Sequence, residues 1–299
     1  MHEAPVLRPL SVGDIVDRTL RLFRANPVLF IGIAVLPDLI VEVLQRASGL
    51  SQTFDLNDLA TAFSSSGASP AFQRQLQPVN PGAALAVGIG AIVFSVIQAG
   101  AMIEAIGQRY LGHAITVREA YARGLRVVPR LIVCGIVVVV LFVAVFLVAA
   151  VAIAVLNFLA AAVIAVILGL VGFFFVLPWA FLSLTVVGPA IVLEGLGPIA
   201  AIRRSFHLMD RSRLRTLGLY ILLWIVSIIL GVIFGVIFFA SFVSEPTLRT
   251  VLQVIAGVAS SALSGPLLYG ALVILYYDLR VRKEAFDLQL AAEALPREG

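Results

Sequence analysis

The chain has 299 residues, of which 61% are hydrophobic and 13% are charged, and its formal net charge at pH 7 is +4. Soluble globular domains contain about 25% charged and about 45–50% apolar residues, so this composition excludes an ordinary water-soluble domain. Cys134 is the only cysteine, which excludes a disulfide within the chain and a metal site built from several cysteines.

The apolar stretches are long enough to cross a membrane several times. Residues 131–193 contain no Asp, Glu, Lys or Arg, whereas about 20 apolar residues, rising about 1.5 Å each, cross the hydrocarbon core. This run must therefore hold two spans. The whole pattern predicts an all-α, polytopic transmembrane helical bundle with spans at residues 28–44, 83–103, 131–154, 161–187, 216–240 and 250–277.

The positions of the basic residues indicate how the spans are oriented. Most of the 21 Arg and Lys residues lie before the first span, after the second, after the fourth and after the sixth. Because short cytoplasmic segments are enriched in Arg and Lys, both termini are expected in the cytoplasm. We expect one membrane domain over residues 1–299, with a cytoplasmic amphipathic segment at 1–27, an extracytoplasmic loop at 45–82 and a cytoplasmic tail at 278–299.

The basic segments share a pattern that predicts a threefold internal repeat. Five pairs match at a constant offset of 105 residues: Ser11 with Thr116, Asp14 with Glu119, Arg18 with Arg123, Leu20 with Leu125, and Arg21 with Arg126. In both copies the hydroxyl and the acid have the spacing of a helix capping box. A weaker third copy covers residues 198–208. We expect each repeat to be an amphipathic helix followed by a transmembrane hairpin.

The predicted amphipathic helices have one apolar and one cationic face. Helices of this kind lie in the membrane surface, where each Arg near anionic lipid contributes on the order of 1 kcal/mol. One interpretation is that the arginines only set the topology. The alternative is a contact surface for anionic lipids or a protein partner, formed by Arg18, Arg21, Arg123, Arg126, Arg203 and Arg204.

Motifs for catalysis or cofactor binding are missing from the sequence. The three histidines, His2, His113 and His207, lie in separate segments, and there is no phosphate-binding loop or dinucleotide-binding turn. Every basic patch adjoins a span, so topology explains it better than nucleic-acid binding does. We therefore expect no metal, no cofactor, no nucleic-acid partner and no enzymatic activity.

Two acidic residues in the first span point to a polar site within the membrane. Asp38 and Glu42 are four residues apart and share one helix face. Asp38 lies near the middle of the first predicted span, where inserting an ionised Asp into the membrane costs about 2.5–3.5 kcal/mol. Asp38 and Glu42 are therefore expected to face the inside of the bundle and to form a polar site with Gln98 of the second span. Burial and the like charge of Glu42 both favour a protonated Asp38, as a proton- or cation-coupled carrier requires. The alternative is a helix that ends soon after Pro37, with both acids in the outer interface.

Small residues recur four apart in the last two spans. They are Gly231 and Gly235 in the fifth, and Gly257, Ser261 and Gly265 in the sixth. This spacing favours close helix packing within the chain. The alternative is a seam between two copies, which leaves a homo-oligomer open.

Four segments, at residues 7–30, 109–121, 199–209 and 267–290, resemble a bacterial membrane-protein family. The first two read LRPLSVGDIVDRTLRLFRANPVLF and RYLGHAITVREAY. The family is described as the glycerophosphoryl diester phosphodiesterase membrane domain. In some relatives this domain precedes a soluble phosphodiesterase barrel, whereas here only residues 278–299 follow the last predicted span. The resemblance implies a location in the bacterial inner membrane, no diesterase activity and no catalytic residues to transfer.

Three functional hypotheses follow from the sequence. The leading one is a non-enzymatic scaffold or envelope-associated partner that acts through its basic cytoplasmic face. The alternative is a small proton- or cation-coupled transporter or channel that uses the polar site near Asp38. A lipid-processing intramembrane enzyme is the least supported, because no nucleophile with a nearby base is recognisable.

Overall fold

The computed structural model describes residues 9–48, 81–154, 163–165, 167, 169, 171–241 and 245–286. All regular secondary structure in these residues is helical, and six helices are long and apolar enough to cross a membrane. The predicted all-α bundle with six spans is therefore confirmed. Most of the predicted loop at 45–82, and the predicted tail from residue 287 onward, lie outside the described residues.

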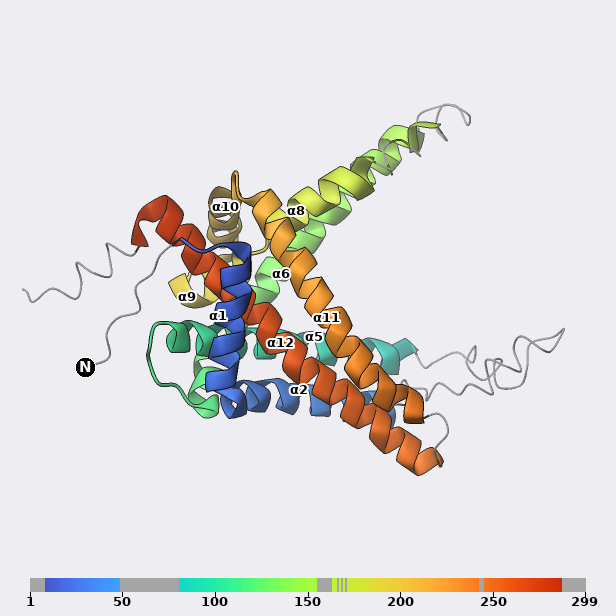
Figure 1. Cartoon of the computed structure of the whole chain (residues 1–299). Helices are drawn as coiled ribbons and strands as arrows, with labels where there is room; N and C mark the ends of the chain where they lie inside the picture. The colour runs from blue at the N-terminus through green and yellow to red at the C-terminus, as the bar shows by residue number, and fades with distance from the viewer. Residues whose placement is uncertain are drawn as a thin grey trace, which may run out of the picture.

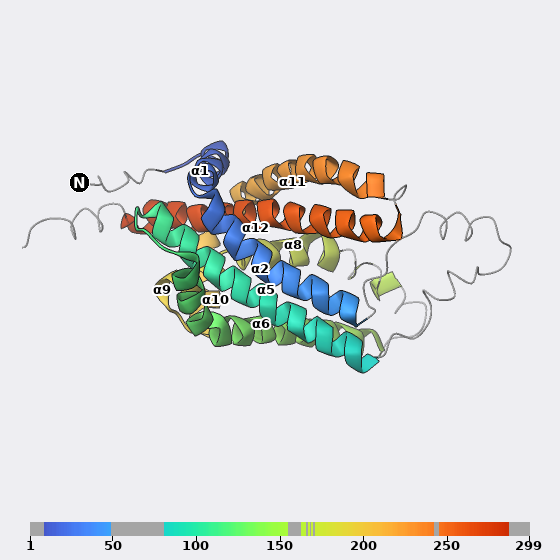
Figure 2. The ribbon, with the colours of Figure 1, turned by 90° about the horizontal axis from the view of Figure 1, so that it is seen from below.

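Ten helical elements cross or flank the predicted membrane. They are α1 (Val12–Ala25), α2 (Pro27–Ala47), α5 (Pro81–Tyr110), α6 (Val117–Ala154), the π-helix η1 (Gly172–Val176), α8 (Leu177–Ser183), α9 (Val187–Glu194), α10 (Pro198–Met209), α11 (Arg213–Ser241) and α12 (Pro246–Glu284), counted over the described ranges (Figure 1). Figure 2 shows α1, α9 and α10 gathered at one end of the bundle. We call these three helices, with residues 278–284 of α12, the arginine-rich end.

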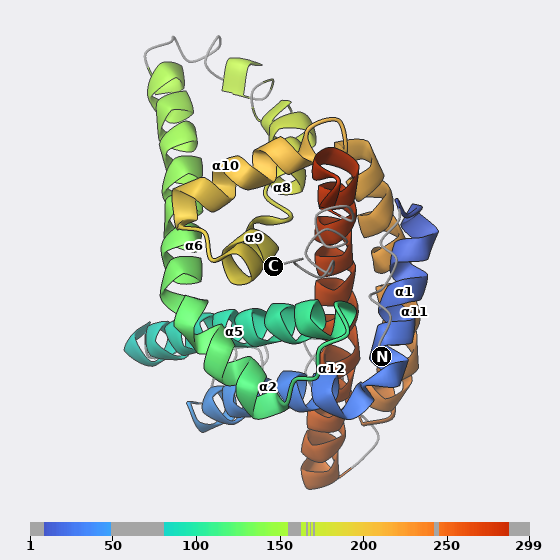
Figure 3. The same ribbon diagram turned by 90° about the vertical axis from the view of Figure 1, so that its left-hand side faces the viewer.

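The boundaries of several spans differ from the prediction, and the fourth, predicted at 161–187, is Phe174–Glu194 within the described residues. The basic amphipathic segment after the second span does not form a separate helix, because it continues directly into the third span as the 38-residue α6. This helix contains Pro129, and Figure 3 shows that its first turns run at an angle to the rest. Proline is a common cause of such bends, since it lacks an N–H and its ring crowds the preceding turn. Residues 278–284, predicted to begin a tail, instead extend α12.

Local sequence explains why α1 is a separate helix. The hydroxyl of Ser11 accepts a hydrogen bond from the Asp14 N–H at 3.2 Å, and the Asp14 carboxylate accepts one from the Ser11 N–H at 2.9 Å. This capping box begins the helix. The helix ends before Asn26, because Pro27 disfavours a helical conformation in the preceding residue and then begins α2 as its first residue.

The second predicted capping box is also present, at the start of α6. The carboxylate of Glu119 accepts a hydrogen bond from the Thr116 N–H at 2.8 Å, and the Thr116 hydroxyl accepts one from the Glu119 N–H at 3.3 Å. The third amphipathic helix, α10, begins with Pro198 after Gly197. The threefold repeat of complete hairpins stays a prediction.

Helix α12 is the central element of the bundle. It contacts α1, α2, α5, α9, α10 and α11. In the most apolar part of each span, 44% of α12 is buried, against 6% of α6 and 6% of α11. The outward faces of α6 and α11 are thus almost wholly apolar and exposed, as expected of helices that face lipid tails.

The apolar face of α1 does not lie free in a membrane surface as predicted. Ile15 and Thr19 are buried, with 0% and 2% exposure, and α1 packs against α11 and α12 (Figure 3). A Cβ atom at Gly270 of α12 would stand 2.6 Å from Cγ2 of Thr19. Protein contacts therefore cover the face that sequence reasoning assigned to lipid.

A close approach of two helix backbones lies away from the small-residue pattern of the last two spans. A Cβ atom at Gly124 of α6 would stand 2.6 Å from the backbone nitrogen of Ala101 in α5. By contrast, added Cβ atoms would meet no atom within 4 Å at the predicted packing glycines, Gly231, Gly235, Gly257 and Gly265. The close packing expected at these four glycines is therefore absent from the described part of the chain, whereas Ser261 of the same pattern contacts Asp38 of α2 at 2.7 Å.

Candidate functional site

Helix α2 continues through Pro37 and ends only at Ala47. The alternative in which the helix stops near Pro37 is therefore wrong. At about 1.5 Å per residue, Asp38 lies about 16 Å from Pro27, which is close to the middle of a helix that crosses about 30 Å of hydrocarbon.

A neighbouring helix compensates for the missing N–H of Pro37. The carbonyl of Ile33 lacks its usual helical donor, because proline at the fourth position beyond it has none. The hydroxyl of Tyr121, on α6, donates to this carbonyl at 2.7 Å. An unsatisfied backbone carbonyl costs several kcal/mol in hydrocarbon, so this bond stabilises α2 where it would otherwise break. Sequence reasoning did not predict it, because the partner comes from another helix.

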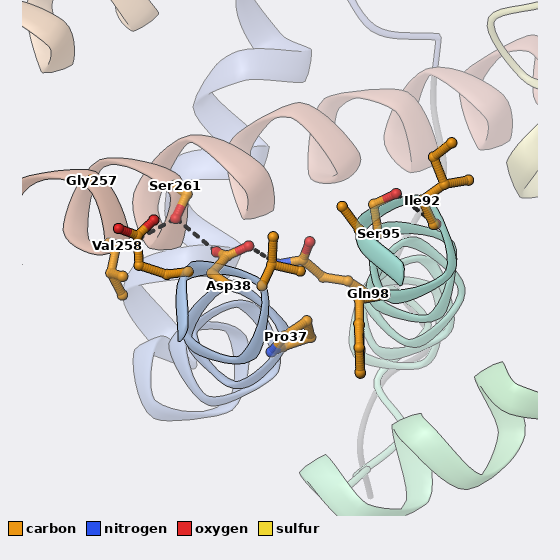
Figure 4. A pocket seen from close by; sticks show the side chains of 12 residues that line it. Pro37, Asp38, Ile92, Ser95, Gln98, Gly257, Val258 and Ser261 are labelled. Carbon is orange, nitrogen blue, oxygen red and sulfur yellow. Dashed lines mark hydrogen bonds between the residues drawn. The ribbon is translucent and has the colours of Figure 1, made fainter. Parts of the chain in front are cut away.

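Two neighbouring helices bring polar side chains to Asp38. The Ser261 hydroxyl of α12 donates to one carboxylate oxygen at 2.7 Å, and the Gln98 amide of α5 donates to the other at a longer 3.4 Å (Figure 4). The same amide donates to the carbonyl of Ala34 at 2.9 Å. The structure thus joins two of the predicted site residues, Asp38 and Gln98. It adds Ser261, for which the sequence showed only the spacing of a small packing residue.

The carboxylate of Asp38 borders a cavity of about 520 Å³ between α2, α5 and α12. Glu42, Ser95 and Gly257 also line it, and most of the other lining residues are apolar (Figure 4). From Asp38 the lining residues on all three helices continue away from the arginine-rich end. A mainly apolar cavity of this size with a few polar groups is typical of small-ligand sites.

Glu42 has a different role from the predicted one. Its carboxylate accepts a hydrogen bond from Nε of Arg46 at 2.8 Å, one helical turn further along α2. This arginine balances the charge of Glu42, so the repulsion that was expected to act on Asp38 is weakened. The two side chains that donate to Asp38 are neutral. An ionised Asp38 therefore gives the cavity a net negative charge, to which a proton or a cation is complementary.

The arginine-rich end holds a second cluster of charged side chains. The guanidinium of Arg204 donates to Glu194 of α9 and Glu284 of α12, each at 2.8 Å. Its hydrogen bonds to Glu284 raise the pKa of Arg204 above its ordinary value, so it remains charged. Arg204 therefore ties α10 to two other helices.

The other arginines predicted to contact lipid or a partner divide into two groups. Arg18 donates to the hydroxyl of Tyr110 at 3.1 Å, and Arg123 lies 3.3 Å from the carboxylate of Glu104. Arg123 is exposed all the same, with 50% of its side chain accessible, and so are Arg21, which pairs with Asp17 on its own helix, Arg126 and Arg203. Only the exposed group presents its charge outward.

Sequence reasoning missed the acid at the centre of this end. Asp278, assigned to the tail, is 2% exposed and accepts a hydrogen bond from the Leu10 N–H at 2.6 Å. It also accepts bonds from Arg215 and from Arg282, the latter at 3.0 Å. The segment before α1 is thus fixed to the last helix. A run of alternating charges after an apolar span is equally typical of a solvated tail, so the sequence carried no signal for this burial.

Residues 10–279 match the family described as a domain of unknown function, DUF7847. The chain belongs to this family. The matched range includes the first five spans, the sixth as far as residue 279, the Asp38 cavity and the buried Asp278. No curated protein and no solved structure matches the chain.

Proposed function

We propose that this protein is a small proton- or cation-coupled transporter of the bacterial inner membrane. The observation that carries the proposal is the carboxylate of Asp38, about midway along a membrane-spanning helix. It borders a cavity of about 520 Å³, and its donors, Ser261 and Gln98, are neutral. Intramembrane acids that face a cavity commonly mark ion or proton pathways.

The arrangement of the arginines supports the orientation in which both chain ends are cytoplasmic. Basic segments favour the cytoplasmic side, and helices α1, α9 and α10 lie together at one end of the bundle (Figure 2). The cavity then extends from Asp38 toward the extracytoplasmic side. The resemblance of four segments to the glycerophosphoryl diester phosphodiesterase membrane domain supports a bacterial source. The protein is proposed to be non-enzymatic, because no nucleophile with an adjacent base was recognised.

Charge movement in proteoliposomes tests the proposal. A pH jump or a Na⁺ jump imposed from the cavity side should displace charge in vesicles that contain the protein. Asp38→Asn keeps the side-chain size but removes the ionisable group, so the signal should fall to that of protein-free vesicles. Glu42→Gln is the matched control on the same helix face. It should retain most of the signal, since the charge of Glu42 is balanced by Arg46.

Two outcomes would contradict transport coupled to Asp38. One is an equal signal from the protein and from its Asp38→Asn variant, and the other is no signal from either. The second outcome would favour the scaffold hypothesis, in which the exposed arginines of the arginine-rich end contact lipids or a protein partner. That hypothesis has weaker support, because Arg204 and Arg123 are bound to acids within the chain.

A further inference from the structure

One face of α11 lines a groove on the outside of the bundle. Leu217, Tyr220, Ile221 and Trp224 are three or four residues apart and so share this face. The opposite wall is α8, which contributes Pro178, Phe181 and Leu182. The groove lies between α11 and the membrane-spanning segment that contains α8, in the region where α8 approaches α11 in Figure 1.

The groove continues into a larger cavity toward α6. Cavities of about 330 Å³ and about 820 Å³ share Pro178, Phe181 and Tyr220, and the larger one reaches Val138 and Phe142 of α6. Apart from Thr185 and the Tyr220 hydroxyl, the side chains that line both cavities are apolar. An apolar chain fits this surface.

Arg213 is the first residue of α11, next to the arginine-rich end, and lies one turn before Leu217 on the same face. Its guanidinium stands 5.0 Å from the centre of the Trp179 ring and donates to the Ser183 hydroxyl at 2.9 Å. The nearest acid, Asp210, is 3.8 Å away and its side chain is 60% exposed, so water screens the pair. Arg213 is thus held in place mainly by neutral groups, and its charge is not balanced by a buried acid as that of Arg204 is.

We propose that this groove binds an anionic phospholipid, with the phosphate at Arg213 and an acyl chain along α8 and α11. The charge is at the membrane interface and the apolar surface extends below it, which matches the order of head and tail in such a lipid. Lipid tails alone give no selectivity for the groove, since any lipid supplies them. Selectivity comes from the cation, which is fixed before the lipid arrives. This site is separate from the Asp38 cavity.

The protein carries its own reporter of this site. Its two tryptophans are Trp179, under Arg213, and Trp224, in the groove wall. The full chain is reconstituted in phosphatidylcholine vesicles that contain either brominated phosphatidylglycerol or brominated phosphatidylcholine at the same mole fraction. Quenching of tryptophan fluorescence should give a relative affinity about fivefold in favour of phosphatidylglycerol, as expected for one charge contact at the membrane surface.

Variants separate this site from general surface charge. Arg213→Gln should reduce the preference to about one. Arg213→Lys keeps the charge but loses the planar guanidinium that lies over Trp179 and donates to Ser183, so it should retain only part of the preference. Arg118→Gln, which removes an exposed arginine from the first turn of α6, should leave the preference unchanged. Equal quenching by both lipids in the wild-type protein would overturn the proposal even if a variant failed to fold. A preference that survives in Arg213→Gln, or disappears in Arg118→Gln, would also overturn it.

Discussion

The bonds around Asp38 and Pro37 connect single residues of α2 to three other helices. Ser261 and Gln98 hold the carboxylate, while Tyr121 satisfies the carbonyl that Pro37 leaves without a donor. Water is not available for hydrogen bonding in the hydrocarbon core, so each of these bonds replaces a bond that the polar group would make to water. The site therefore depends on the placement of α5, α6 and α12 as much as on the residues of α2.

Removal of the Tyr121 hydroxyl should weaken this arrangement. In Tyr121→Phe the carbonyl of Ile33 loses its donor. We expect the free energy of unfolding to fall by about 0.6–1.7 kcal/mol, from the average to the maximum measured for hydrogen bonds between transmembrane helices. Reversible unfolding in mixed micelles measures it. Tyr220→Phe is the control, since its hydroxyl stands 3.5 Å from Thr185. An equal loss of stability in both variants would show that the bond from Tyr121 to Ile33 does not stabilise the protein more than the longer contact of Tyr220 does.

Two adjacent arginines also differ in a way that the sequence does not reveal. Arg204 bonds to Glu194 and Glu284, whereas Arg203 is exposed. Arg204→Gln leaves two partly buried carboxylates that share Arg280 as their remaining cation partner, and we expect a loss of about 1–3 kcal/mol of stability. Arg203→Gln should change it by less than about 0.5 kcal/mol. Thermal unfolding of both variants in the same detergent tests whether Arg204 is paired and Arg203 is not. A similar change in unfolding temperature for the two variants would contradict this difference.

At the scale of the helices, close packing depends on the partner and not on glycine spacing alone. Gly124 allows the backbone of α6 to approach Ala101 of α5. Gly231 and Gly235 have the spacing expected of packed helices, but their Cα atoms face open space. Small residues spaced four apart identify a helix face without large side chains. Only the fold determines whether another helix of the chain packs against that face.

Alanine substitutions should distinguish these cases. In Gly124→Ala the new methyl group would meet backbone atoms of α5, which cannot rotate away, so we expect a loss of about 1–3 kcal/mol. Gly135→Ala, on the same helix, meets no atom within 4 Å and should be neutral or slightly stabilising, because alanine favours helix more than glycine does. Unfolding by denaturant in micelles gives both values, and equal stability of the two variants would contradict the packing.

Sequence reasoning succeeded where the information was local. Hydropathy predicted the six spans, and the capping boxes at Ser11 and Thr116 are both present. It failed for tertiary relations, such as the burial of Asp278 and the internal pairing of Arg204. For the candidate site, the depth of Asp38 indicated a polar contact and Gln98 was named, but Ser261 and Tyr121 were not. Their partners lie on other helices, and no periodicity within a single helix encodes such a pairing.

At the scale of the whole molecule, α12 joins two packed regions. One contains α1, α9, α10 and α11, and the other contains α2, α5 and α6; both hydrophobic clusters include residues of α12. The Asp38 cavity lies in the second region, while the groove below Arg213 lies on the far side of α11 and α8. Helix α12 lines the Asp38 cavity, whereas α8, α11 and α6 line the groove and its continuation, so the two proposed sites share no residues and each is testable on its own.

The hydrogen bond from Leu10 to Asp278 has a consequence for the order in which the protein assembles during synthesis. The first helix leaves the ribosome early, yet the residues that cover its apolar face, and the acid that holds the segment before it, are translated last. Until α12 is inserted, Ile15 and its neighbours have only lipid or a chaperone to cover them. Docking of α1 onto the bundle is thus a late step in assembly, because it requires that the sixth span has entered the membrane.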